Sequence, residues 1–149
     1  METMRIDAFL RESPMFAVHR AARRFNSFVD LALAADDLSF LEGLVLVAIV
    51  FETPRQIKPS QLAETFATTR ANISHVLSSL EAKGLLQRKI DPADARAYLL
   101  TLKPSGRKSA MRVMRMHDRM QHVFEKEVGK AKLGEALTVI RALEKLAEP

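Results

Sequence analysis

Residues 69–84 of this chain combine a helix N-cap, a single apolar stripe and a glycine that ends the helix. Thr69 is placed to cap a helix that runs to about Lys83, and Gly84 follows at a position where helices commonly end. The apolar residues in between recur at i, i+3, i+4 and i+7, so they share one helix face. The segment predicts a helix that packs on a core along one side only. The apolar residues are Ile73, Val76, Leu77 and Leu80.

The opposite face of this helix carries short polar residues and few charges, whereas a solvated helix surface is ordinarily rich in charged residues. Short side chains let a helix backbone approach the floor of a DNA groove, and Arg, Asn and His can donate hydrogen bonds to base edges. A Ser- and Ala-rich helix packed against another helix would show the same pattern, so this face alone leaves both interpretations open. Its predicted residues are Arg70, Ala71, Asn72, Ser74, His75, Ser78 and Ser79.

A shorter helix is expected just before this one. Pro59 suits the first turn of a helix, where its missing N–H is not needed, and the apolar pattern continues to about Phe66. Only a short turn then precedes Thr69. Two helices joined by so tight a turn form the helix-turn-helix arrangement.

A basic β-hairpin is expected directly after Gly84. Residues 85–90 and 97–102 have strand character, and the loop 91–96 between them contains Pro and Asp, which favour turns. Cations on such a ribbon can follow the DNA backbone and place an arginine in the minor groove. Alternatively, Asp94 and Arg96 pair to stiffen the turn, and both interpretations hold if Asp94 orients Arg96. The cations on the ribbon are Arg88, Lys89 and Arg96.

The positive charge of the chain is concentrated in this region. The formal net charge is +5. Residues 69–108 contain eight Lys and Arg against three Asp and Glu, which accounts for the whole excess. A local positive field predicts a polyanionic partner, with nucleic acid first and an acidic membrane surface second. The membrane is disfavoured because the basic residues do not lie opposite a broad exposed apolar face.

Several other classes of protein are disfavoured by what the chain lacks. It has no cysteine, which removes disulfides, thiolate zinc sites and cysteine redox sensing. No nucleophile–base group, Gly-rich phosphate loop or carboxylate pair stands out, so we expect no enzyme, no metal site and no cofactor. The longest apolar run, residues 43–51, is shorter than the roughly 20 residues that span a bilayer. The sequence therefore predicts a cytoplasmic protein.

The flanking segments are predicted to be helical, so the expected fold class is mainly α with a small β-hairpin wing (α+β). Apolar residues recur at helical spacing through residues 14–35 on more than one stripe, which suggests a partner chain. Ser39 and Glu42 fit a capping box that opens a helix apolar nearly all round. Further helices are expected over residues 104–128 and 132–147. The last helix would turn Leu133, Leu137, Ile140, Leu143 and Ala147 inward.

Four fragments of the chain stand in a characteristic order and spacing. They are Leu62-Ala63-Glu64, the helix end Leu80-Glu81-Ala82-Lys83-Gly84-Leu85, the loop Asp91-Pro92-Ala93-Asp94-Ala95-Arg96, and Leu100-Thr101-Leu102-Lys103-Pro104-Ser105-Gly106. Together they resemble the MarR family of bacterial winged-helix regulators over roughly residues 38–127. The loop and the turn after it are the most specific part. Ala67 departs from the family pattern, which often has Gly there, and Thr68 replaces a typical apolar residue.

The resemblance implies a homodimer that binds a pseudo-palindromic operator in double-stranded DNA. Residues 1–37 would form an N-terminal dimerisation helix, 38–103 the winged helix-turn-helix, and 104–149 the C-terminal dimerisation helices, in one intertwined domain. The expected function is that of a transcriptional regulator acting as a repressor. The alternative is a winged helix used as a protein-interaction module, although such modules often lose the basic wing and polar face kept here.

The expected DNA contacts fall into three groups. The helix capped by Thr69 would enter the major groove, and Arg96, oriented by Asp94, would enter the adjacent minor groove. The predicted major-groove residues are Thr69, Arg70, Asn72, Ser74 and His75. Contacts with the DNA backbone are predicted for Ser78, Arg88, Lys89, Lys103 and Arg107.

A small-molecule effector is a further expectation from the resemblance. Family members commonly release DNA when a small aromatic or anionic compound, or an oxidant, changes the spacing of the two DNA-reading parts. The lack of cysteine argues against thiol oxidation here. Candidate ligand contacts on the first long helix are Phe16, His19, Arg20 and Arg23. The alternative is that these four are ordinary core and solvent-facing residues.

Overall fold

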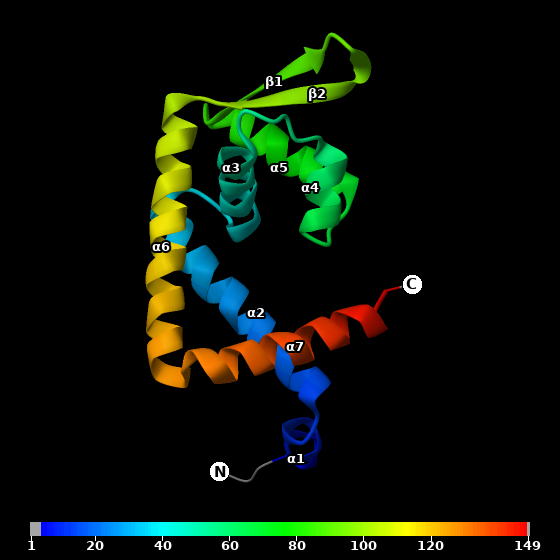
Figure 1. Ribbon diagram of the computed structural model, residues 1–149, viewed down its shortest axis with the longest axis vertical. Helices are drawn as coiled ribbons and strands as arrows, with labels where there is room; N and C mark the ends of the chain where they lie inside the picture. Colours follow the sequence, from blue (N-terminus) through cyan, green and yellow to red (C-terminus); the bar gives the residue numbers. More distant parts are fainter. Residues whose placement is uncertain (1–3, 149) are drawn as a thin grey trace. The chain divides into compact units, whose positions relative to one another are not determined.

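The computed structural model describes residues 4–148, without the side chains of residues 95 and 96. It is mainly helical with one two-stranded antiparallel hairpin, which confirms the predicted fold class (Figure 1). None of the helices formed by the described residues is long and apolar enough to cross a membrane. In chain order the elements are α1 Arg5–Arg11, α2 Pro14–Leu33, the 3-10 helix η1 Ala34–Asp36, α3 Phe40–Glu52, α4 Pro59–Thr65, α5 Arg70–Ala82, β1 Leu86–Asp91, β2 Asp94–Leu102, α6 Pro104–Val128 and α7 Lys130–Leu146.

The chain divides into two compact units. The central unit is Asp30–His117, and the terminal unit consists of the described residues of Met1–Val29 and Asp118–Pro149. Helices α2 and α6 each contribute residues to both units. Nearly all buried apolar side chains among the described residues belong to the central unit.

Helix α3 lies in the core of the central unit. The Ser39 hydroxyl accepts from the Glu42 N–H at 3.2 Å, and the Glu42 carboxylate accepts from the Ser39 N–H at 2.9 Å. The predicted capping box is therefore confirmed. Val45 and Leu46 are fully buried, and α3 contacts both α5 and β2. An apolar surface on several sides of α3 is what this central position requires.

Strand β2 of the hairpin is longer than the sequence predicts, and β1 ends one residue later than predicted. Strand β2 begins at Asp94, so the strands extend into the segment 91–96 that was expected to be a loop. The Asp91 carboxylate accepts from the Ala93 N–H at 2.9 Å, which closes the turn locally. The strand pairing has an irregularity just before Asp91. The sequence predicts Asp91 and Asp94 in a loop, whereas in the structure they end β1 and begin β2 on either side of a short turn.

The terminal unit leaves much apolar surface exposed in the single chain. Helix α1, which the sequence did not predict, and helix α7 contain no buried residue. Gly129, at φ 89°, separates α6 from α7 as expected. The sequence placed one face of α7 inward, but Leu137 is 49% exposed and Ile140 is 39% exposed. Periodicity identifies the apolar face of a helix, but it does not identify what covers that face.

Candidate nucleic-acid interface

Helices α4 and α5 meet at a tight turn. Leu62 and Ala63 of α4 are buried, and the Thr68 N–H donates to the Ala63 carbonyl at 2.9 Å. Ala67 lies in the left-handed region at φ 50°. Glycine adopts this conformation most easily, but the turn here accepts a residue with a Cβ. The predicted helix-turn-helix geometry is therefore present.

Helix α5 begins and packs as its sequence predicts. The Thr69 hydroxyl accepts from the Asn72 N–H at 3.0 Å, which confirms the predicted cap. The four residues of the apolar stripe are buried, and Ile73 and Leu80 are completely so. The opposite face is open to solvent through the first turns of the helix. Its exposed residues are Arg70, Ala71, Asn72, Ser74, His75 and Ser78.

Two polar side chains of α5 have partners that the sequence did not reveal. Ser79 was predicted on the exposed face, but it is partly buried and donates to the Glu42 carboxylate at 2.6 Å. The Asn72 amide donates to the Thr68 hydroxyl at 2.8 Å. The exposed polar face of α5 therefore ends at Ser78, one residue earlier than predicted.

Arg88 joins the hairpin to α5. Its guanidinium lies 2.8 Å from the Glu81 carboxylate and donates to the Ser78 hydroxyl at 3.2 Å. It also lies over the Tyr98 ring, 5.6 Å from the ring centroid. The hydrogen bond from Arg88 lowers the pKa of the Glu81 carboxyl, against a smaller opposing effect of desolvation. Arg88 thus holds β1 against the last turns of α5, independently of the DNA contact that the sequence predicted for it.

The outer part of the hairpin carries the remaining predicted wing residues. Lys89 is exposed on β1, and Asp94 begins β2. The backbone of residues 95 and 96 belongs to β2, but the side chain of Arg96 lies outside the described residues. The minor-groove role of Arg96, and that of Asp94 in orienting it, stay predictions.

The chain turns closely from β2 into α6. The Lys103 N–H donates to the Leu85 carbonyl at 3.0 Å, and the Ser105 hydroxyl donates to the Gly84 carbonyl at 2.9 Å. Gly106 packs directly on the Leu85 backbone, and a Cβ added there would overlap the Leu85 carbonyl oxygen. This close approach explains why the turn has glycine. The Lys103 side chain, a predicted DNA-backbone contact, is exposed.

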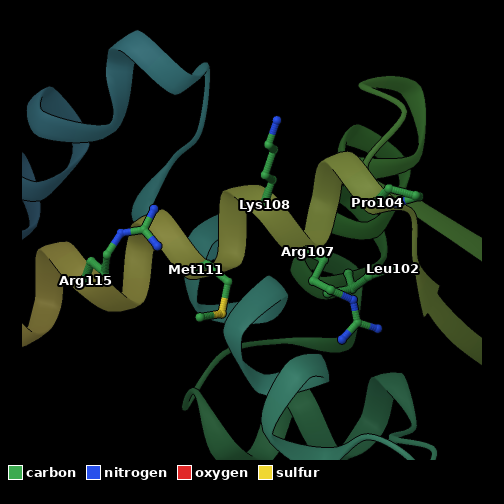
Figure 2. A pocket seen from close by; sticks show the side chains of 6 residues that line it. All are labelled: Leu102, Pro104, Arg107, Lys108, Met111 and Arg115. Atoms are coloured by element: carbon green, nitrogen blue, oxygen red, sulfur yellow. The ribbon is translucent and has the colours of Figure 1, made fainter.

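A basic groove follows the start of α6. Figure 2 shows Arg107, Lys108 and Arg115 extending from this one helix, with Met111 among them. The groove has a volume of about 650 Å³. Within the part of the chain that the structure describes, these three cations form no ion pair. Arg107, a predicted DNA-backbone contact, therefore lies in an uncompensated positive surface. The lining residues are Leu102, Pro104, Arg107, Lys108, Met111 and Arg115.

The candidate effector contacts lie elsewhere, on α2 in the terminal unit. Phe16, His19, Arg20 and Arg23 are all exposed in the single chain. Phe16 packs edge-to-face with Phe9 of α1, with 6.3 Å between the ring centroids. None of the four lines the groove on α6.

Known proteins resemble this chain in the region that contains α5 and the hairpin. The sequence profile of the MarR family matches residues 36–97, which include α3, α4, α5 and most of the hairpin. The HTH-type transcriptional regulator YdcH of Bacillus subtilis is 28% identical over 117 residues, covering 75% of this chain and 78% of that protein. Residues 36–97 are therefore a winged helix-turn-helix of the MarR type.

Solved structures of bacterial transcriptional regulators show the same fold. A Staphylococcus aureus MepR–DNA complex has a TM-score of 0.82 at 16% identity, over 91% of this chain and 97% of that chain. The PcaV transcriptional regulator from Streptomyces coelicolor, in complex with its natural ligand, has a TM-score of 0.76 at 24% identity, over 99% and 100%. The family that residues 36–97 match consists of DNA-binding transcriptional regulators and not of enzymes.

Sequence reasoning missed the contacts that connect α5 to α3. Ser79 of α5 and Lys83, which directly follows α5, both reach Glu42 of α3, although about 40 positions separate them from it in the chain. The capping pattern accounted for Glu42 locally, so nothing in it indicated a distant partner. The Glu81–Arg88 pair left a clearer signal, because opposite charges flank the turn at Gly84.

Proposed function

We propose that this MarR-family protein is a cytoplasmic homodimeric repressor that reads a pseudo-palindromic operator with α5 and the β1–β2 wing. The observation that carries the proposal is the exposed polar face at the start of α5, together with the exposed Lys89 on the hairpin and the basic groove at the start of α6. A helix with short side chains fits the floor of the major groove. In a symmetric dimer the two reading helices would lie about one DNA turn apart, ~34 Å.

The proposed roles of the residues follow from their positions. Thr69, at the start of α5, and the exposed residues after it would face the bases. The exposed cations beside them would contact phosphates, which supply most of the affinity and little of the specificity. The proposed base contacts are Thr69, Arg70, Asn72, Ser74 and His75, with Arg96 in the minor groove and Asp94 orienting it. The proposed backbone contacts are Ser78, Arg88, Lys89, Lys103 and Arg107.

The exposed apolar surface of the terminal unit supports the dimer. Val139 is 63% exposed and Val123 is 66% exposed. Apolar side chains gathered in this way on α6 and α7 favour burial against a partner. Sedimentation equilibrium measures the association directly, and a monomer at micromolar concentration would contradict the dimer.

The DNA-binding proposal is tested by selecting bound sequences from random duplexes and then measuring affinity for the selected operator. We expect an inverted repeat and a steep decrease of affinity with salt. Arg96→Ala should weaken operator binding by about 1–3 kcal/mol without unfolding the protein. Arg141→Ala, on α7, is the control with the same change of charge. Equal binding by a folded Arg96→Ala dimer would remove the wing from the interface, and salt-insensitive association with a protein would favour an interaction module.

Release of DNA by a small aromatic or anionic effector is part of the same proposal. PcaV, which has this fold, was solved with its natural ligand. The exposed Phe16, His19, Arg20 and Arg23 combine an aromatic ring with cations, which suits an aromatic anion. Titrating benzoate and related carboxylates into the operator complex should release DNA from the wild type. If Arg20→Ala and Arg23→Ala respond to the titration as the wild type does, the effector contacts lie elsewhere.

A further inference from the structure

Glu42 is a carboxylate buried between α3 and α5, with an exposed fraction of only 6%. Both of its oxygens are fully used. Oε1 accepts from the Ser79 hydroxyl at 2.6 Å and from Lys83 Nζ at 3.2 Å. Oε2 accepts from the Ser39 N–H at 2.9 Å and from Lys83 Nζ at 3.0 Å. One side chain therefore caps α3 and holds both Ser79 in the last turn of α5 and Lys83 just after it.

Lys83 extends this network to the turn before α3. It follows the last residue of α5, and its side chain is 26% exposed. Its Nζ donates to the main-chain carbonyl of Asp37, whose carboxylate lies 3.9 Å away. Asp36 is held in turn by Arg112 of α6 at 2.6 Å. The C-terminal end of α5 is thus bound to a turn that an arginine of α6 also holds.

These contacts determine the rotation and tilt of α5, which its apolar stripe does not. Apolar packing is non-directional, so a stripe of Leu, Ile and Val allows small rotations and tilts at little cost. Hydrogen bonds to a buried charge are directional, and a displaced charge would lose partners that water cannot replace. The network therefore selects one rotation and one tilt of α5.

A small change of tilt would matter at the other end of the helix. Helix α5 has 13 residues, so it is about 20 Å long. A tilt of about 10° around its C-terminal end would move the first turn by about 3 Å, which is the length of a hydrogen bond. The exposed residues proposed to read bases lie in those first turns.

We propose that Glu42 and Lys83 are positioning residues that set the orientation of α5, and with it the sequence selectivity of DNA binding, without contacting DNA. This inference rests on the proposed DNA-reading role of α5. Ser79 is the third member of the network, because its hydroxyl is the shortest contact of Glu42. The residues that determine selectivity then include Glu42, Ser79 and Lys83, which lie on the side of α5 that faces α3.

The test compares operator and scrambled duplexes at one salt concentration, by fluorescence anisotropy, with thermal unfolding recorded in parallel. Glu42→Gln places an amide against the Lys83 ammonium, and Lys83→Met leaves the carboxylate without its cation. The double variant Glu42→Gln/Lys83→Met removes both the Glu42 carboxylate and the Lys83 ammonium, so it keeps the net charge of the wild type. We expect the double variant to bind the operator about tenfold more weakly, comparable to the effect of one mismatched base pair. Its affinity for the scrambled duplex should change less than about twofold, since phosphate contacts are retained.

The test includes a control variant at an exposed ion pair, fallback variants and a check on the wild type. Glu52→Gln breaks the exposed Glu52–Arg55 pair, which has a similar distance of 3.0 Å, and it should leave the selectivity ratio unchanged. If Glu42→Gln does not fold, the double variant and Ser79→Ala still report on selectivity. A folded double variant with the wild-type ratio of operator to scrambled affinity would overturn the inference. Failure of the proposed function would be seen separately, as a wild type that does not prefer its selected operator.

Discussion

The two compact units of this protein use their apolar residues in opposite ways. In the central unit they are enclosed by the chain itself, and α3 and α5 both have fully buried side chains. In the terminal unit, α1 and α7 contain no buried residue, and Phe9 is 63% exposed. The central unit therefore has the core that an independent fold needs, whereas the terminal unit has a surface suited to association. Substitutions in matched pairs, one in each unit, test this difference.

The largest difference is expected for the loss of a leucine side chain. Leu46→Ala in α3 removes a side chain that is completely buried, and should lower the free energy of unfolding by about 3 kcal/mol. Leu137→Ala in α7 shortens a side chain that is 49% exposed, and should weaken self-association more than it destabilises the fold. Urea denaturation and sedimentation measure the two effects. A large loss of stability for Leu137→Ala at protein concentrations that keep the chain monomeric would contradict the comparison.

A glycine in each unit gives the next largest contrast. Gly106→Ala should cost about 2 kcal/mol of stability, because the new Cβ would overlap the Leu85 carbonyl and the backbone must shift. Gly134→Ala in α7 meets no atom within 4 Å, so it should raise stability by about 0.5–1 kcal/mol through helix propensity. Thermal unfolding distinguishes the opposite signs. Equal effects of the two substitutions would mean that the turn into α6 can relax.

Acid should weaken the central unit through Glu42. Burial alone would raise the pKa of Glu42, but hydrogen bonds from Ser79, Ser39 and Lys83 outweigh it, so the pKa lies below its ordinary value of 4.5. A carboxyl with a lowered folded-state pKa contributes stability above its unfolded-state pKa. It loses that contribution as pH falls through the folded-state value. Stability should therefore be level near neutral pH and decrease below about 4.5.

The matched control for this acid effect is Glu42→Gln, measured by urea unfolding at several pH values. This variant should be less stable at neutral pH and should lose less stability on acidification than the wild type. The Glu81 carboxyl, whose pKa Arg88 also lowers, stays in place and accounts for part of the remaining slope. An acid dependence identical to that of the wild type would show that Glu42 ionisation does not support the fold.

Local features of the fold could be predicted from the sequence because they depend on residues close together in the chain. The Thr69 cap, the Ser39–Glu42 capping box and the stripe on α5 each need only a few neighbouring positions, and each is confirmed. The sequence also predicts the hairpin, but the predicted loop, residues 91–96, is longer than the turn between β1 and β2 in the structure. Turn-forming residues such as Asp91 also occur where a strand ends, and pairing across the hairpin decides how far the strand continues.

Features that join distant segments could not be predicted in this way. Ser79 follows the exposed face of α5 in the sequence pattern, yet its hydroxyl reaches Glu42, 37 residues earlier. Likewise, the helical period of α7 identified its apolar face, but Leu137 stays half exposed in the single chain. Which residue meets a polar group, and what covers an apolar face, depend on tertiary and quaternary contacts that a local pattern does not contain.

The order of the two units along the chain has a consequence for how new regulators can be assembled. The central unit is one uninterrupted stretch, Asp30–His117, whereas the terminal unit is built from both ends of the chain. The central unit is thus an insertion cassette, with its two junctions inside α2 and α6. Under the proposed function, exchanging this cassette between relatives at the same two helical positions would transplant operator choice while keeping the host's pairing surface.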